Sequence, residues 1–280
     1  MPHIALVVDS SNDLPPDILL RHRIRVVPLL IRFGEDEHLD AYERREIFWQ
    51  RFASGEIPRT AAPSPDAFGR AFRSALQESE QVIAMTVTSK HSSTYNSALL
   101  AAREFDGRVH VFDSWSISLG VGLLALRAAE NIARGMNVPA ILADLEDARR
   151  RQHLILYLDS LDAIQRGGRL APAMSAIKRM SSMLSIKLIL STKEGEFAYA
   201  GAVRSPRKGM AHIMHAIAGR GAESVAVAHT RAPELAAMLA DGVASALDFP
   251  RPDILSAEAG PVLGVHGGFR AFGVTFIAQK

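Results

Sequence analysis

The sequence predicts an α/β protein of two domains, with an N-terminal domain over residues 1–155 and a C-terminal domain over residues 156–280. At 280 residues the chain is longer than a usual single domain, so two domains that share one cleft are expected. The first half alternates wholly apolar runs with helical patterns, which predicts a mostly parallel sheet covered by helices. The second half contains a hairpin pattern among further helices, which predicts an α/β sandwich with a mixed sheet.

In the first half, each predicted strand is a short run without the polar alternation of a half-exposed strand, which indicates burial on both faces. The predicted strands are Ile4 to Asp9, Arg25 to Phe33, Gln81 to Thr86 and Arg108 to Asp113. The predicted helices are Pro15 to His22, Glu43 to Ser54, Pro65 to Ser79, Ser93 to Glu104 and Leu119 to Gly135.

Capping residues mark the ends of three of these helices. Asp13 precedes two prolines, which the first turn of a helix tolerates, and is therefore predicted to cap the first helix. Ser64 precedes another proline and is predicted to cap the helix that follows. Gly135 lies just beyond a long periodic segment and is predicted to be its C-terminal cap.

In the second half, Lys193-Glu194-Gly195 separates two strand-like runs and predicts a hairpin turn in which the glycine adopts a positive φ. The predicted strands are Ser185 to Thr192, Glu196 to Arg204, Ala222 to Ala228 and Gly273 to Ala278. The predicted helices are Pro206 to Ala218 and Pro233 to Leu247.

The composition is that of an ordinary globular protein, with 48% hydrophobic and 22% charged residues. The absence of cysteine excludes disulfides, cysteine-ligated zinc and thiol catalysis. The chain runs from Met1 directly into a predicted strand, without the regions of a signal peptide, and no apolar run reaches the length of a membrane span. We therefore expect a cytoplasmic protein.

The net charge of +2 does not indicate a nucleic-acid partner, because recognition of nucleic acid requires basic residues clustered on one face. Two interpretations of the basic clusters stay open, either solvated helix ends and loops or a docking face for an acidic partner or a phosphate. The clusters are Arg149 to Arg151, Lys178 to Arg179 and Arg204 to Lys208.

Hydroxyl side chains gather in two loops that precede predicted helices. The segment Thr88 to Tyr95 follows a predicted strand, at the edge of a parallel sheet where ligands bind. A helix N-terminus there attracts anions, and Ser92 and Ser93 would add donors, although simple capping is the alternative. Thr60 belongs to the second such loop, Arg59 to Ser64, whose alternative interpretation is routine capping by Ser64.

Two glycine-containing segments are further candidates. Gly260 to Gly268 allows close backbone approach to a ligand and contains His266, a candidate cation or proton donor, or else a structural histidine. Gln165 to Leu170 contains Arg169, which would present a guanidinium to a carboxylate or phosphate, or else lie exposed beyond a helix. The chain contains no P-loop, H-E-x-x-H or G-x-S-x-G motif, so neither catalytic residues nor a metal site are predicted.

In order along the chain, these segments resemble the DegV family over essentially the whole sequence. The start, Val8 to Pro15, is similar to the family's D-S-x-x-D-L opening, and Thr88 to Tyr95 resembles its S-S-x-x-S-G-T-Y segment. Thr60 to Ser64 is similar to the family's T-S-x-P-S motif, and Asp113 to Gly122 resembles its D-S followed by S-x-G-x-G. Leu161 to Leu170 resembles the motif L-x-x-L-x-x-G-G-R-I/L, and Gly260 to Gly273 resembles the glycine-rich end of the family pattern.

The resemblance implies a bacterial-type lipid-binding protein that holds one long-chain fatty acid between its two domains, without a cofactor. It also implies a partner, a separate ATP-dependent fatty acid kinase, and is compatible with transient membrane contact. The residues implied around the fatty acid carboxylate are Thr60, Ser92, Ser93 and His266, and those implied in phosphoryl transfer or partner contact are Arg169 and Arg204.

The sequence departs from the family pattern at three places. Ala61 replaces a hydroxyl residue, Ser93 replaces a glycine, and Phe269-Arg270 replaces Pro-Gly near the end. The alternative function is a hydrolase or acyl transferase that uses Ser92 or Ser93 with His266, which would need a third residue to orient the imidazole.

Overall fold

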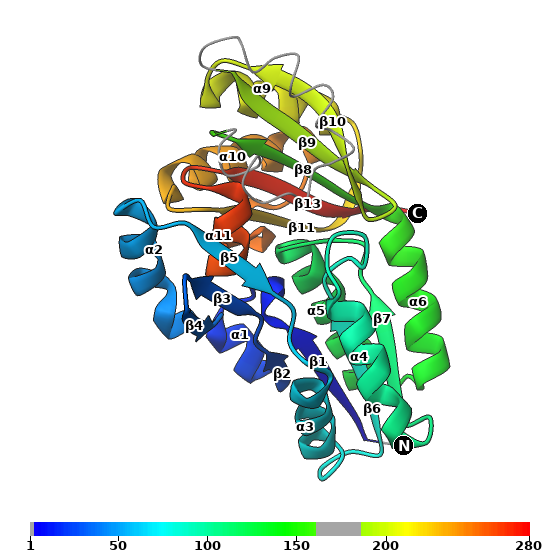
Figure 1. Cartoon of the computed structure of the whole chain (residues 1–280). Helices are drawn as coiled ribbons and strands as arrows, with labels where there is room; N and C mark the ends of the chain where they lie inside the picture. The colour runs from blue at the N-terminus through cyan, green and yellow to red at the C-terminus, as the bar shows by residue number, and fades with distance from the viewer. Residues whose placement is uncertain (1–2, 161–185) are drawn as a thin grey trace. The chain divides into compact units, whose positions relative to one another are not determined.

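The computed structural model describes residues 3–160 and 186–280 (Figure 1). The chain forms two compact units, each of which is described by itself. The first contains Met1–Arg150 with Gly260–Val262, and the second contains Arg151–Ala259 with Leu263–Lys280. The chain therefore returns to its first unit for one short segment late in its course.

The main sheet of the first unit has four parallel strands in the order β2-β1-β6-β7. The strands are β1 (Ile4–Asp9), β2 (Ile24–Val27), β6 (Gln81–Thr86) and β7 (Val109–Asp113). Alternate residues of a strand face opposite sides, and Val7 and Ala84 pack with Phe68 and Phe72 in one continuous core. This arrangement confirms the predicted mostly parallel sheet.

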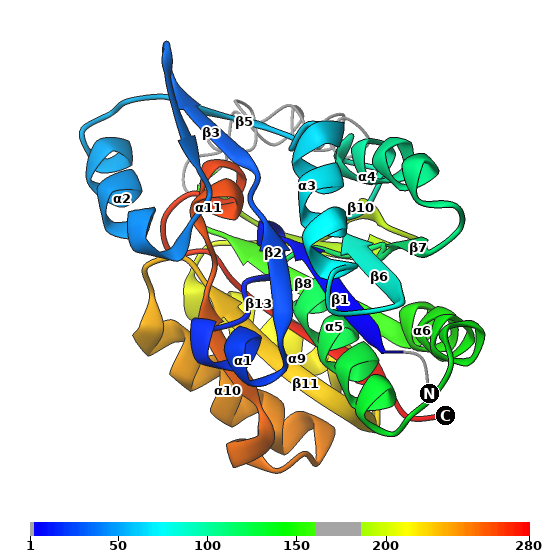
Figure 2. The same ribbon diagram turned by 90° about the horizontal axis from the view of Figure 1, so that it is seen from below.

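Helices cover both faces of this sheet, as Figure 2 shows. Helices α3 (Pro65–Ala75) and α4 (Thr94–Ala102) contribute to the core on one face, and α5 (Leu119–Ala133) packs against β1 and β6. The remaining helices are α1 (Pro16–Arg21), α2 (Arg45–Ala53) and α6 (Val138–Arg151), with short 3-10 turns at Ser10–Asn12, Tyr42–Arg44 and Arg103–Phe105.

The prediction of a single strand from Arg25 to Phe33 is wrong. Strand β2 ends at Val27, and β3 (Leu30–Phe33) joins a separate antiparallel sheet with β4 (Asp36–Leu39) and β5 (Pro58–Ala61). Pro28 has no amide hydrogen for the ladder, and the amide of Leu29 donates to Ser10 Oγ at 3.0 Å. The chain therefore leaves the parallel sheet between these two strands.

The predicted caps are confirmed at two helices and wrong at the third. Ser64 Oγ accepts the amide of Ala67 at 3.2 Å, and Gly135 follows α5 with φ of 76°. The residue that precedes α1 is Pro15, which provides no side-chain cap. Asp13 instead faces other parts of the first unit, because its carboxylate accepts hydrogen bonds from Ser118 and Gly260.

The second unit contains a mixed six-stranded sheet in the order β10-β9-β8-β13-β11-β12. Only the β11–β12 pair within this sheet is parallel. The strands are β8 (Gln152–Leu158), β9 (Lys187–Lys193), β10 (Glu196–Val203), β11 (Ala222–His229), β12 (Leu255–Glu258) and β13 (Phe272–Ala278). The predicted mixed sheet is confirmed, as is the turn between β9 and β10, where Glu194 and Gly195 both have positive φ.

Helices α9 (Pro206–Ile217) and α10 (Pro233–Leu247) bury their apolar sides on one face of this sheet. Tyr157 lies at the centre of that core, with its ring stacked on Phe272 at 4.5 Å and its hydroxyl bonded to Asp159 at 2.5 Å. A 3-10 turn, Arg251–Asp253, and a short helix, α11 (Pro261–Gly267), complete the described secondary structure of this part of the chain.

Gly209 of α9 packs directly against the fixed ring of Tyr157, because a Cβ atom at this glycine would lie 2.5 Å from Tyr157 Cδ2. We predict that Gly209→Ala lowers the free energy of unfolding by about 1–3 kcal/mol, since the buried ring cannot move aside. The measurement is chemical denaturation of the full chain.

The matched control is Gly69→Ala in α3, where the added Cβ would meet only the mobile end of Arg73 at 3.3 Å. This change is expected to stabilise the protein by about 0.5–1 kcal/mol, because alanine favours the helix over glycine. Equal stability changes in the two variants would contradict the assigned packing.

Candidate functional site

The carboxyl ends of β1, β6 and β7 lie at one edge of the parallel sheet, where ligands bind in folds of this class. Each strand runs there into a loop of polar residues. The loop after β1 begins at Ser10, the loop after β6 contains Thr88 and Ser89, and the loop after β7 begins at Ser114. This carboxyl edge is the candidate site within the first unit.

Asp9 joins the first two of these loops. Its side chain is fully buried, and it accepts the Val87 amide at 2.7 Å as well as the amide and hydroxyl of Ser11 at 2.9 and 2.5 Å. Burial raises the pKa of Asp9, while these three hydrogen bonds act in the opposite direction. The carboxylate therefore fixes loop positions rather than presenting itself to a ligand.

Asp113 joins the loop after β6 to the loop after β7 in the same way. Its Oδ1 accepts the amides of Ser89 at 3.1 Å and Trp115 at 3.2 Å, and the amide of Thr88 donates to Ser116 O at 2.9 Å. The loop after β6 is therefore held on both sides by buried carboxylates, so its backbone is ordered before any ligand arrives.

Ser92 and Ser93 lie at the start of α4, where the first amides of a helix attract an anion. The Ser92 hydroxyl lies 2.7 Å from Thr94 Oγ1 and accepts the Thr94 amide at 3.2 Å, so it is the side chain that caps this helix. Ser93 occupies the N-cap position, but its exposed side chain makes no capping bond. Its hydroxyl is therefore available to a ligand.

Thr60 lies on β5, opposite Ile31 of β3 in the small antiparallel sheet. The chain then continues through Ala61 to Ser64, the N-cap of α3, and α3 packs beside α4. Thr60 and Ser92 thus precede neighbouring helices of one unit, and the prediction that each hydroxyl loop leads into a helix is confirmed.

The remaining predicted residues belong to other parts of the chain. His266 is half-buried on α11 and Arg204 is exposed directly after β10, both in the second unit. Arg169 lies outside the described residues. The segment Gly260 to Gly268, expected to allow close backbone approach to a ligand, forms helix α11 over Pro261–Gly267, and Gly268 directly after it has a positive φ of 70°.

Sequence reasoning assigned Arg149 only to a basic cluster, but its guanidinium lies at the carboxyl edge. It stacks on Trp115 at 3.9 Å and on Phe112 at 4.8 Å, and it donates to Asp113 O at 2.7 Å. Burial is the main cause that lowers its pKa. An arginine within a basic run gives no sequence signal of such stacking, since Trp115 is distant in the sequence.

Asp13 and Asp40 bind the late segment of the chain to the first unit. Asp13 accepts the Gly260 amide and the Ser118 hydroxyl, each at 2.6 Å, and Arg45 Nη2 lies 3.8 Å away. Asp40 accepts the Ser10 hydroxyl at 2.7 Å. Burial raises the pKa of Asp13 to about 6 and that of Asp40 to about 7.

Within the described ranges, no cluster of histidine and acidic side chains could hold a metal ion. In the same part of the chain, no helix combines the length and the apolarity required to span a bilayer.

Comparisons with known proteins match the chain over its whole length. The model of the DegV family, described as "Uncharacterised protein, DegV family", matches residues 3–279. A DegV domain-containing protein of Caldanaerobacter subterraneus is 33% identical over 282 residues, covering 99% of both chains. A DegV domain-containing protein of Deinococcus radiodurans is 34% identical over 277 residues, covering 97% of both chains.

Two solved structures are similar over the full length. A DegV family protein from Thermus thermophilus, described by its fatty acid binding, has a TM-score of 0.91 and 34% sequence identity, with 100% of both chains covered. DegV from Bacillus subtilis, described as a fatty acid binding protein, has a TM-score of 0.83 and 25% identity, also with 100% of both chains covered.

The raised pKa of Asp40 predicts a pH dependence of stability. The folded protein binds the proton of Asp40 more tightly than the unfolded chain does. Ionisation of this carboxyl therefore leaves the free energy of unfolding unchanged below about pH 4 and lowers it fully above about pH 7. Relative to Asp40→Asn, the free energy of unfolding of the unsubstituted protein should fall by on the order of 3 kcal/mol across this range.

The measurement is denaturant unfolding of both proteins at several pH values. Asp17→Asn serves as the control, because it replaces an exposed carboxylate on α1 and leaves the buried carboxyl of Asp40 in place. A difference between the unsubstituted protein and Asp40→Asn that does not change with pH would show that this carboxyl is not held protonated by burial.

Proposed function

This chain belongs to the DegV family, and we propose that it binds one long-chain fatty acid without catalysing a reaction of its own. The observation that carries the proposal is the full-length likeness, at 34% identity, to the Thermus thermophilus protein described by its fatty acid binding. The proposal comprises two domains, 1–155 and 156–280, with the carboxylate of the acid at the hydroxyl residues and its tail in an apolar tunnel.

The start of α4 supports a carboxylate site. Free amides of a first helical turn stabilise an anion by about 0.3–1 kcal/mol, and hydrogen bonds from hydroxyls add to this. The Ser93 side chain is exposed and its hydroxyl makes no capping hydrogen bond, and the hydroxyl of Ser92 is oriented by Thr94. We assign the head-group contacts to Ser92 and Ser93 together with Thr60 and His266.

We propose that the acyl tail packs on an apolar cluster of the second unit that is separate from its main core. Helices α9 and α10 pack on one face of its sheet, and a separate apolar cluster contains Leu158, Leu188 and Leu190, with Leu156 and Phe197 packed against it. Each buried methylene contributes about 0.8 kcal/mol, so ten of them supply about 8 kcal/mol. The tail therefore provides most of the affinity, and the hydroxyls fix the direction in which the acid lies.

The proposal includes presentation of the bound acid to a separate ATP-dependent kinase, with Arg169 and Arg204 as contacts for the kinase or for the transferred phosphoryl group. Arg204 is exposed and precedes α9, whose cap, Ser205, accepts the Lys208 amide at 3.3 Å. An exposed arginine at such a position is accessible to an acidic surface or a phosphate, which is the chemistry that this step requires.

No contact in the first unit favours the alternative of a serine hydrolase. The Ser92 hydroxyl is engaged by the hydroxyl and amide of Thr94, and the exposed Ser93 hydroxyl has no base bonded to it among the described residues. A serine-reactive phosphonate should therefore leave the protein unmodified, whereas stoichiometric labelling at Ser92 or Ser93 would establish the enzyme instead.

We predict that purified protein carries a fatty acid in near-stoichiometric amount, because a buried tail dissociates slowly. Organic extraction followed by mass spectrometry would identify it. An empty protein that also fails to bind added long-chain fatty acids in titration would contradict the proposed function.

A second prediction concerns the head group. Ser93→Ala should weaken fatty acid binding by about fivefold, corresponding to about 1 kcal/mol for one lost hydrogen bond, and leave stability nearly unchanged because Ser93 does not cap α4. Ser64→Ala should do the reverse, lowering stability by about 1 kcal/mol through the lost cap of α3 while binding stays the same. Titration and denaturation of both variants compare the two roles, and unchanged affinity in Ser93→Ala would remove Ser93 from the site.

A further inference from the structure

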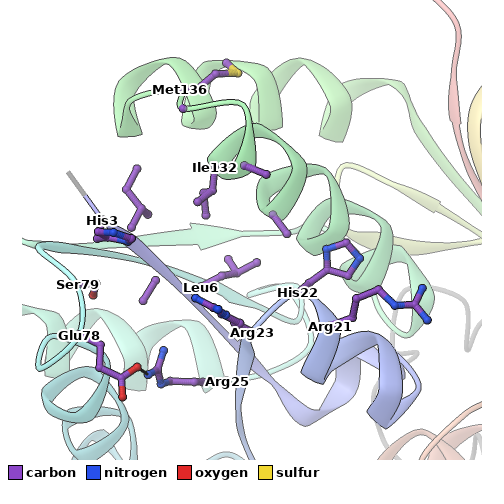
Figure 3. A pocket seen from close by; sticks show the side chains of 15 residues that line it. His3, Leu6, Arg21, His22, Arg23, Arg25, Glu78, Ser79, Ile132 and Met136 are labelled. Carbon is purple, nitrogen blue, oxygen red and sulfur yellow. Dashed lines mark hydrogen bonds and ion pairs between the residues drawn. The ribbon is translucent and has the colours of Figure 1, made fainter. Parts of the chain in front are cut away.

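A cavity lies at the edge of the parallel sheet opposite the carboxyl edge, beside the amino ends of β1 and β2 (Figure 3). Its volume is about 500 Å³, within the range of small-molecule sites. An apolar floor is formed by β1, by α5 and by the turn that follows α5. The floor residues are Ile4, Leu6, Ala129, Ile132, Ala133 and Met136. We call this cavity the amino-edge pocket.

Basic side chains surround this floor from three parts of the chain. His3 precedes β1, and Arg21 and His22 lie at the end of α1. Arg23 lies just before β2 and Arg25 lies within it, as Figure 3 shows. Glu78 is the acidic residue that lines the pocket. The three guanidiniums and this one carboxylate leave a charge of about +2 when the imidazoles are neutral.

The guanidiniums differ in what holds them. Arg25 Nη2 lies 2.6 Å from Glu78 Oε2 and is therefore committed to that ion pair. Arg21 lies 3.6 Å from Asp17, but both side chains are about 70% exposed, and such a pair exchanges readily for another anion. Arg23 is exposed and makes no ion pair with the described residues. Arg21 and Arg23 are thus available to a ligand.

The backbone of Arg23 makes its side chain straightforward to test. The amide of Arg23 donates to Leu20 O at 3.1 Å just beyond α1, and its φ is 52°. Helices commonly end with glycine in this left-handed conformation, because a side chain strains it. Substitution of Arg23 by glycine therefore removes the guanidinium without adding backbone strain.

The charge and shape of the pocket select a class of ligand. A phosphate monoester carries close to two negative charges at neutral pH and can therefore pair with both Arg21 and Arg23, whereas a carboxylate carries one. Guanidiniums bind phosphate oxygens in pairs, and the apolar floor can hold an organic ring. The carboxyl ends of α1 and α5 each oppose an anion by about half a charge, so binding depends on the arginines.

We propose that the amino-edge pocket binds an organic phosphate monoester of about the size of a mononucleotide. The phosphate lies between Arg21 and Arg23, with His22 beside it, and the organic group lies on the floor formed by β1 and α5. This site is separate from the carboxyl edge and does not depend on fatty acid binding.

The test is titration of the full chain with AMP, with adenosine and inorganic phosphate as separate probes. AMP is expected to bind at micromolar to millimolar concentration, more tightly than either probe alone, and to weaken as salt rises from about 50 to about 200 mM. Adenosine binding as tightly as AMP would exclude the phosphate contact, and inorganic phosphate binding as tightly would exclude the contact with the floor. No AMP binding at millimolar concentration would overturn the proposal.

The decisive variant is Arg23→Gly, which removes the guanidinium and also relieves the left-handed backbone. It should weaken AMP binding by about tenfold or more while thermal stability stays the same or rises, so loss of binding cannot reflect misfolding. The matched control is Arg231→Gly in the second unit, where the arginine also has a positive φ of 50° but does not line the pocket. Unchanged AMP affinity in Arg23→Gly, or an equal loss in Arg231→Gly, would overturn the assignment.

Discussion

The buried carboxylate of Asp13 is the contact on which the first unit most depends. It accepts a hydrogen bond from the amide of Gly260, 247 residues later in the chain, and another from Ser118 at the start of α5. A carboxylate in this position is costly to desolvate, and only its donors make it tolerable. The same group therefore fixes three distant segments at once, which an apolar residue of similar size could not do with comparable directionality.

Buried carboxylates also explain how the carboxyl edge can present hydroxyls. Asp9 and Asp113 accept hydrogen bonds from the loop amides of Val87, Ser89 and Trp115, so these amides are satisfied without the hydroxyl of Ser93. The hydroxyl of Ser93 is then left for another partner. Positioning and binding are in this way carried by different side chains, as preorganised sites require.

The sequence predicted those elements whose periodicity is local, such as β1, β6, α5 and α10, as well as the turn at Glu194-Gly195. It did not predict the break at Pro28, because the apolar run continues through it while the hydrogen-bond partners change. It also missed α6, although Ile141, Leu145 and Ala148 are buried at helical spacing. The roles of Asp13 and Arg149 depend on contacts between distant segments, which one sequence does not encode in any local pattern.

The return of Gly260–Val262 to the first unit has a consequence for the order of events during synthesis. Chains emerge from the ribosome N-terminus first, and domains generally fold as they appear. Here the parallel sheet can assemble early, but the Gly260 donor is synthesised 247 residues after its acceptor Asp13. Until that late segment emerges, the buried carboxylate of Asp13 lacks one of its hydrogen-bond donors.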